Sequence, residues 1–131
     1  MLAVLLCLSG TSFTADKKKL EAALAAVKAN LKTSVGKQYD ELLGKELVAR
    51  YFVSIKQCRQ SLPAASRVDP FDMFLKLRSD GQVVDALIYP ESQLAFCSRD
   101  VLSTARFSNP PHDEYLDQRA CAIEVRDHGG V

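Results

Sequence analysis

Apolar residues repeat along the chain with two different periods, and the change between them falls near residue 70. Within residues 16–32, leucine and valine recur three or four positions apart, which predicts an amphipathic helix. A longer stripe of the same spacing predicts a second helix over residues 37–60, where Gly44 weakens the pattern without ending it. The proline-bounded segment from Pro63 to Pro70 predicts a linker.

Beyond this linker, apolar residues alternate with polar ones, as they do on a half-buried β-strand. Residues 71–78 and 83–89 predict two strands, and Asp80-Gly81 between them favours the tight turn of a hairpin. Helical spacing returns over residues 90–105. After a polar loop, a last alternation at residues 121–126 predicts a third strand.

This order of elements predicts an α+β fold: two N-terminal helices, then β-β-α-β, with a three-stranded antiparallel sheet covered by helices. We expect the helices to cover one face of the sheet. The third strand should lie beside the first, because the connection through the third helix returns the chain to that side. The second and third strands would then be the edges.

Residues 1–15 predict an export segment, because an apolar run, MLAVLLCLS, precedes the first charged residue, Asp16. A short apolar run followed by small residues is typical of a secretory signal and is too short to span a bilayer. We expect cleavage after Ala15, one domain over residues 16–131, a periplasmic or secreted location, and no stable membrane insertion of the mature chain. Two alternatives are a buried element of a cytosolic fold and a lipid anchor on Cys7, which the large Leu6 disfavours.

Removing the predicted signal leaves three of the four cysteines, Cys58, Cys97 and Cys121. An oxidising compartment favours a disulfide between two of them. Cys121 falls on the apolar face of the last predicted strand, where a thiol packs like a small hydrophobic group. We therefore predict a Cys58–Cys97 disulfide that joins the second and third helices.

The charge balance and the scarcity of catalytic motifs argue against several classes of function. The chain has 17 Lys and Arg against 16 Asp and Glu, a net charge of +1, which argues against nucleic-acid binding. His112 lies beside Asp113 and Glu114, but three adjacent positions do not place three metal ligands on one face. The sequence also lacks a CxxC pair and a glycine-rich phosphate-binding loop. We expect a protein that is not an enzyme and has no catalytic residues, cofactor or metal.

The C-terminal half resembles the TonB-type C-terminal domain. The resemblance is carried by the hairpin FDMFLKLRSDGQVVDALIY, the helix with Cys97 and Val101, Phe107 followed by Pro110-Pro111, and the strand CAIEV. It covers a little under half of the chain, and the long proline-rich linker of TonB proteins is absent. The resemblance implies the sheet described above and a module that docks envelope proteins by strand addition.

The whole chain looks like a small periplasmic immunity protein of a type VI secretion effector. This resemblance rests on its size, its predicted export and its arrangement of helices and cysteines. It implies a protein that binds and blocks a secreted cell-wall-degrading enzyme, such as a peptidoglycan amidase.

The loop from Asn109 to Asp117 is the predicted contact with such a partner, because two prolines stiffen it and reduce the entropy lost on binding. Its candidate partner-binding residues are Asn109, Pro110, Pro111, His112, Glu114 and Tyr115. The alternative is a plain connector, with Tyr115 folded back on the core. Exposed edge strands would also allow pairing with an extended peptide or formation of a homodimer.

Overall fold

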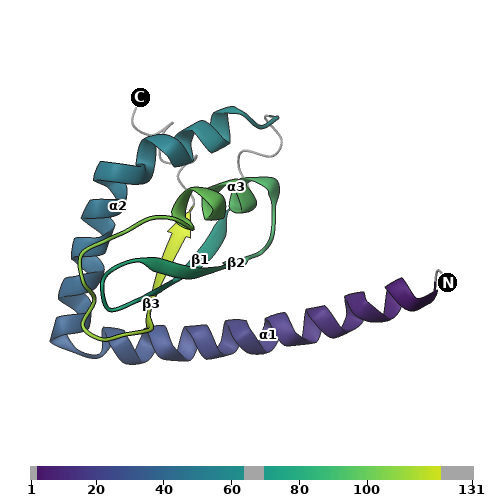
Figure 1. The fold of residues 1–131 in the computed structure, drawn as a ribbon, viewed down its shortest axis with the longest axis horizontal. Coiled ribbons are helices and arrows are strands. Elements are labelled where there is room, and N and C mark those ends of the chain that lie inside the picture. Colours follow the sequence, from purple (N-terminus) through teal and green to yellow (C-terminus); the bar gives the residue numbers. More distant parts are fainter. Residues whose placement is uncertain (1–2, 64–69, 122–131) are drawn as a thin grey trace.

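A computed structural model describes residues 3–63 and 70–121, with side chains from Lys17 onward, and confirms the α+β prediction (Figure 1). The elements in chain order are α1 (Ala3–Leu31), α2 (Ser34–Gln60), β1 (Phe71–Leu77), β2 (Val83–Tyr89), α3 (Gln93–Leu102) and β3 (Tyr115–Cys121).

The three strands form an antiparallel sheet in the order β2-β1-β3, which confirms that the third strand lies beside the first. β3 begins at Tyr115, six residues before the predicted start at Cys121, so residues 115–118 were wrongly assigned to a loop. One of their inward positions holds the charged Asp117, so the sequence here does not show the alternation of apolar and polar residues that marks a strand. Residues 122–126 of the predicted strand lie outside the described residues.

The sheet lies between two helical layers. α2 and α3 pack on the face that carries Met73, Leu75 and Leu77, while the C-terminal half of α1 packs its Ala23 and Val27 against Phe74 on the opposite face. Figure 1 shows α1 and α3 on opposite sides of the sheet. The expectation that helices cover a single face was therefore wrong for α1. Alternation of side chains along β1 gives each layer its own apolar surface.

A tight corner turns the chain from α1 into α2. The Oγ1 of Thr33 accepts a hydrogen bond from the backbone N–H of Gly36 at 2.9 Å, which caps the start of α2. A Cβ at position 36 would lie 1.9 Å from the carbonyl oxygen of Asn30, so only glycine fits there. This close approach lets the two helices diverge sharply onto different faces of the sheet.

The predicted disulfide is confirmed between Cys58 near the end of α2 and Cys97 on α3, with their Cα atoms 5.8 Å apart. Cys121, the last residue of β3, is a thiol that packs against the same core. Among the described residues, no helix is long and apolar enough to cross a membrane. The side chains of the predicted signal segment lie outside the described residues. Among the α1 side chains that the structure describes, the first apolar one packed on the core is Leu20.

Replacing both Cys58 and Cys97 with alanine should lower the free energy of unfolding by about 3–4 kcal/mol, because the bridge joins positions with a sequence separation of 39. Urea denaturation of the oxidised wild type and the double variant measures the difference. Reduced wild-type protein should match the variant, and Cys121→Ala serves as the single-cysteine control. An unchanged unfolding midpoint in the double variant would contradict this stabilising role.

Candidate protein-binding surfaces

The long connection between α3 and β3 is held first by the start of β2. The backbone N–H of Val83 donates to the carbonyl of Ala105 at 3.0 Å, and that of Phe107 donates to the carbonyl of Gly81 at 2.9 Å. Phe107 and Ala105 are buried in the core below. The first part of the connection is therefore a fixed extension of the sheet.

Two side chains of α2 then hold Ser108. Its backbone N–H and its hydroxyl donate to the two carboxylate oxygens of Glu46 at 2.8 and 2.5 Å, and the Tyr39 hydroxyl donates to its carbonyl at 2.7 Å. Partial burial of Glu46 opposes its ionisation, but the Ser108 hydrogen bonds hold the pKa of this carboxyl below its usual value. Burial raises the pKa of Tyr39, which keeps its hydroxyl a donor.

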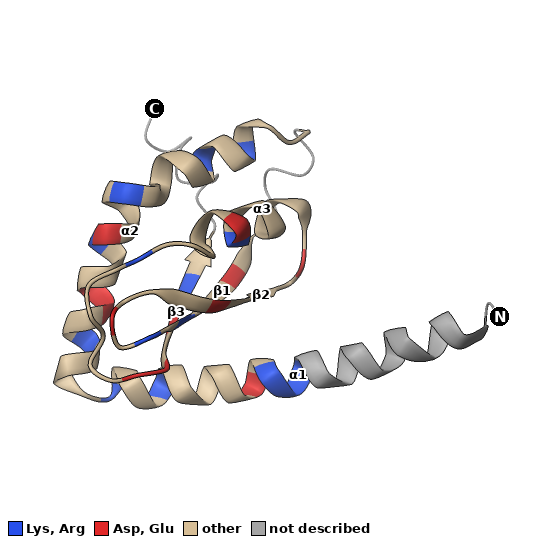
Figure 2. Ribbon diagram, in the orientation of Figure 1, with Lys and Arg blue, Asp and Glu red and all other residues tan. Residues whose placement is uncertain are grey.

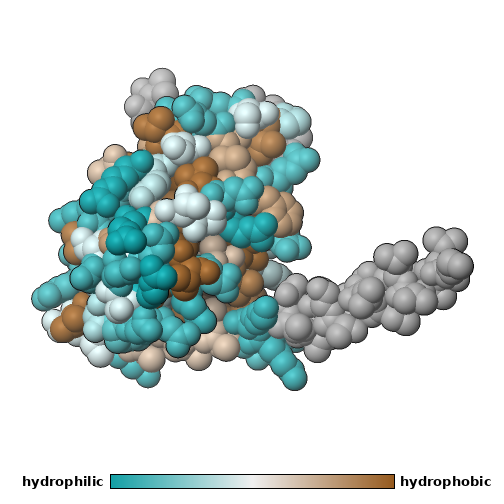
Figure 3. All heavy atoms as spheres, viewed as in Figure 1, coloured by the Kyte–Doolittle hydropathy of each residue, from teal (hydrophilic) through white to brown (hydrophobic). Residues whose placement is uncertain are grey.

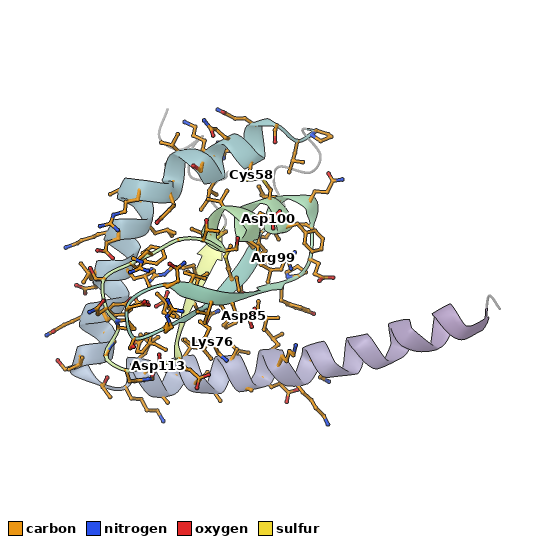
Figure 4. The ribbon with its side chains drawn as sticks, viewed as in Figure 1. Cys58, Lys76, Asp85, Arg99, Asp100 and Asp113 are labelled. Atoms are coloured by element: carbon orange, nitrogen blue, oxygen red, sulfur yellow. A yellow bond between two sulfur atoms is a disulfide. The ribbon has the colours of Figure 1, made fainter. Side chains whose placement is uncertain are left out.

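The tip of the connection, residues 109–114, is called the loop apex below. It is tied to two further elements: the Asp113 carboxylate accepts from the backbone N–H of Ser79 at 2.7 Å, and the His112 Nε2 lies 3.2 Å from the Asn30 Oδ1. Figure 4 labels Asp113 beside the corner where α1 meets α2. The apex is therefore supported by the β1–β2 turn, by α1 and, through Ser108, by α2.

The structure places the six predicted contact residues in two groups. Asn109, Pro111, His112 and Glu114 are exposed, whereas Pro110 and Tyr115 are buried. The ring of Tyr115 is only 2% exposed and meets Tyr39 edge to face, with centroids 5.1 Å apart. Tyr115 is therefore a core residue, and its ring is not available as an interface anchor. It is buried because it opens β3 on the face that α2 covers.

The surface around the loop apex is mixed in character. The exposed side chains of Leu31 and Val35 flank the corner that His112 contacts, and Lys76 lies 3.7 Å from the carboxylate of Glu114. Figure 2 shows acidic and basic residues interspersed at this end of the molecule, and Figure 3 shows small apolar areas among hydrophilic ones. A non-obligate protein–protein interface has about the same apolar share as the rest of a protein surface, so this composition is compatible with a contact.

A second surface, called the α2–β3 groove below, lies beside the edge strand β3. It is shallow and largely open to solvent, and it is lined by Asp40, Glu41, Gly44, Lys45, Val48, Ala49 and Arg119. A Cβ at position 44 would lie 2.9 Å from the Nη1 of Arg119, so Gly44 makes room for this guanidinium.

Arg119 joins α2 to β3 through two carboxylates. Its Nε donates to Asp117 at 2.7 Å, and its Nη2 donates to both the side chain and the backbone carbonyl of Asp40, each at 2.7 Å. Asp117 is only 3% exposed. Burial disfavours its charge more than Arg119 stabilises it, and Asp40 adds to the effect, so the pKa of Asp117 rises to about 7.

Sequence patterns did not reveal this ionic network, because Asp40 and Arg119 are 79 positions apart. The single available signal was a pair of opposite charges, Asp117 and Arg119, at alternate positions before Cys121. Within the described parts of the chain, no group of three or more His, Cys, Asp or Glu side chains is arranged to hold a metal.

Comparisons of the chain with protein-family models, with curated proteins and with solved structures find no match.

The raised pKa of Asp117 predicts that this residue makes stability fall as pH rises. Its folded-state pKa, about 7, exceeds the ordinary value of 3.8, so the folded state holds an extra proton between these two pH values. The associated stabilisation is complete below about pH 4 and is lost as pH rises through about 7. Denaturation of wild type and Asp117→Asn across this range should show a flatter profile for the variant. Parallel profiles would contradict the assignment.

Proposed function

We propose that this protein is an exported protein-binding protein that inhibits a secreted cell-wall-degrading enzyme, such as a peptidoglycan amidase, as a periplasmic immunity protein does. The observation that carries the proposal is the loop apex, an exposed loop held by hydrogen bonds to Asn30 and Ser79 and anchored, at the preceding Ser108, to Glu46. A loop already fixed in one conformation loses little entropy on entering the cleft of an enzyme.

Two further features support an exported protein. The Cys58–Cys97 disulfide is compatible with a periplasmic or extracellular location, where such bonds persist. The described core contacts of α1 begin at Leu20, so cleavage after Ala15 would leave them in place.

Inhibition would be steric. The apex offers Pro111 as a rigid apolar contact, with His112 and Glu114 as hydrogen-bonding groups on either side of Asp113. Such a loop blocks substrate access when it lies across an active-site cleft. No covalent step and no cofactor are needed.

A second candidate is a TonB-like docking module that binds envelope proteins by strand addition. The observation that favours it is the α2–β3 groove, which adjoins β3 at the edge of the described sheet. An extended peptide can form backbone hydrogen bonds with such an edge, and a second copy of the chain could pair there to form a homodimer. Val48, 62% exposed, would contact the added strand.

The same charge reversal placed on each surface separates the two candidates. Glu114 and Glu41 are both exposed, and Glu→Lys changes the net charge equally at either position. If the loop apex binds the enzyme, Glu114→Lys should weaken inhibition about 10-fold or more while Glu41→Lys leaves it unchanged.

The measurement uses the mature chain to capture partners from the periplasm and the secreted fraction, followed by assay of the captured hydrolase with each variant. Capture of envelope scaffold proteins, with Glu41→Lys as the damaging change, would favour the docking module instead. If both variants still bind the partner, neither surface is the contact. Tyr115→Ala is unsuitable as a probe, because removing this buried ring should cost about 3–5 kcal/mol of stability.

A further inference from the structure

Two carboxyl groups meet on one guanidinium nitrogen where side chains of α2 and β3 come together. The Nη2 of Arg119 donates to the Oδ1 of Asp40 at 2.7 Å and to the Oδ1 of Asp117 at 3.2 Å. The two carboxyl groups are also hydrogen-bonded to each other. A hydrogen bond between two carboxyl groups needs a proton on one of them, so this pair holds one proton between its members.

The surroundings of Asp117 explain why the proton stays with it. Its side chain is buried, whereas Asp40 lines the open α2–β3 groove. Across the sheet its register partner is the apolar Leu75. The charged or titratable groups around it are Arg119 and Tyr115 on β3, and Tyr39, Asp40, Glu41 and Lys45 on α2 and along the groove. Loss of the shared proton would leave two adjacent carboxylates bound to the same guanidinium.

The same turn of α2 holds the connection that leads to the loop apex. Tyr39, the neighbour of Asp40, donates its hydroxyl to the carbonyl of Ser108 at 2.7 Å. Its ring meets that of Tyr115, which lies two positions before Asp117 on β3. The start of the apex is therefore attached to α2 beside one carboxyl group, and its end runs into β3 beside the other. A change in the spacing of α2 and β3 reaches both ends of the apex.

We propose that the Asp40–Asp117 pair is a pH-sensitive latch between α2 and β3, which determines how firmly the loop apex is held. While the pair keeps its proton, the hydrogen bond between the carboxyl groups and the contacts of Arg119 join the strand to the helix. When the proton leaves, the two carboxylates repel each other and the contact opens more often. The apex is then held firmly at acidic pH and more loosely at neutral and alkaline pH. The inference concerns the unbound protein and does not rest on the proposed inhibition.

The direction of the change follows from the pKa of Asp117, about 7 in the folded protein against an ordinary value of 3.8. The latch is complete below about pH 4 and is lost as pH rises through about 7.

Amide hydrogen exchange of the unbound protein, corrected for the intrinsic effect of pH on exchange, tests the latch. Between about pH 5 and about pH 8, the protection of residues 115–119 and of the Ser108 amide should fall about 10-fold or more. Asp117→Asn cannot lose a proton at this position, so its protection should stay constant. Asp40→Asn removes the neighbouring negative charge and should move the midpoint of the change to lower pH, which a merely structural role of Asp40 would not do.

Two control variants, His112→Gln and Asp100→Asn, should keep the wild-type response. The ring of His112 meets that of Tyr115 with centroids 5.0 Å apart, so His112→Gln tests whether the imidazole causes the change. Asp100 is exposed on α3, and its variant makes the same change of charge away from the latch. A response that disappears in His112→Gln, persists in Asp117→Asn or keeps its midpoint in Asp40→Asn would overturn the proposal. An equal fall in protection throughout the β1–β2 hairpin would overturn it as well, because it would indicate global unfolding.

Discussion

Burial of the central strand β1 on both faces is the constraint on which the rest of the structure depends. Met73, Leu75 and Leu77 are fully buried under α2 and α3, and Phe74, 2% exposed, is buried under α1. A strand with two apolar faces is stable only between two layers that exclude water from both. The α1–α2 corner provides them by sending consecutive helices to opposite sides of the sheet.

The position of α2 then determines both candidate binding surfaces. One side of this helix presents Glu46 and Tyr39 to Ser108 and so fixes the connection that ends in the loop apex. Its other side presents Asp40 to Arg119 and forms the wall of the α2–β3 groove. Both surfaces are therefore rigid for the same reason, since each is hydrogen-bonded to a helix that is packed on the core and joined to α3 by a disulfide. This rigidity suits a protein that acts by binding.

Much of this fold could be predicted from sequence because its signals are local. Apolar spacing marks α2 and the β1–β2 hairpin within single segments. The Cys58–Cys97 pairing was predicted from the expected export of the chain and from the positions of these two residues on helices, with Cys121 assigned to a strand. The start of β3 could not be found in this way, since Asp117 occupies an inward position that is stabilised by Arg119 and α2 rather than by apolar packing. The two-sided covering of the sheet was missed because apolar periodicity shows that a helix has a buried face but not which sheet face it meets. For the candidate site, the exposed apex residues were found through their prolines, whereas the burial of Tyr115 depends on contact with Tyr39, far away in sequence.

Hydrogen–deuterium exchange on the complex with a captured cell-wall hydrolase tests the central claim most directly, because it locates the contact without altering the protein. The account predicts new protection at residues 109–114 and the adjoining α1–α2 corner, with β3 exchanging as it does in the unbound protein. Protection confined to β3 and the groove-lining turns of α2, with the loop apex unchanged, would contradict it.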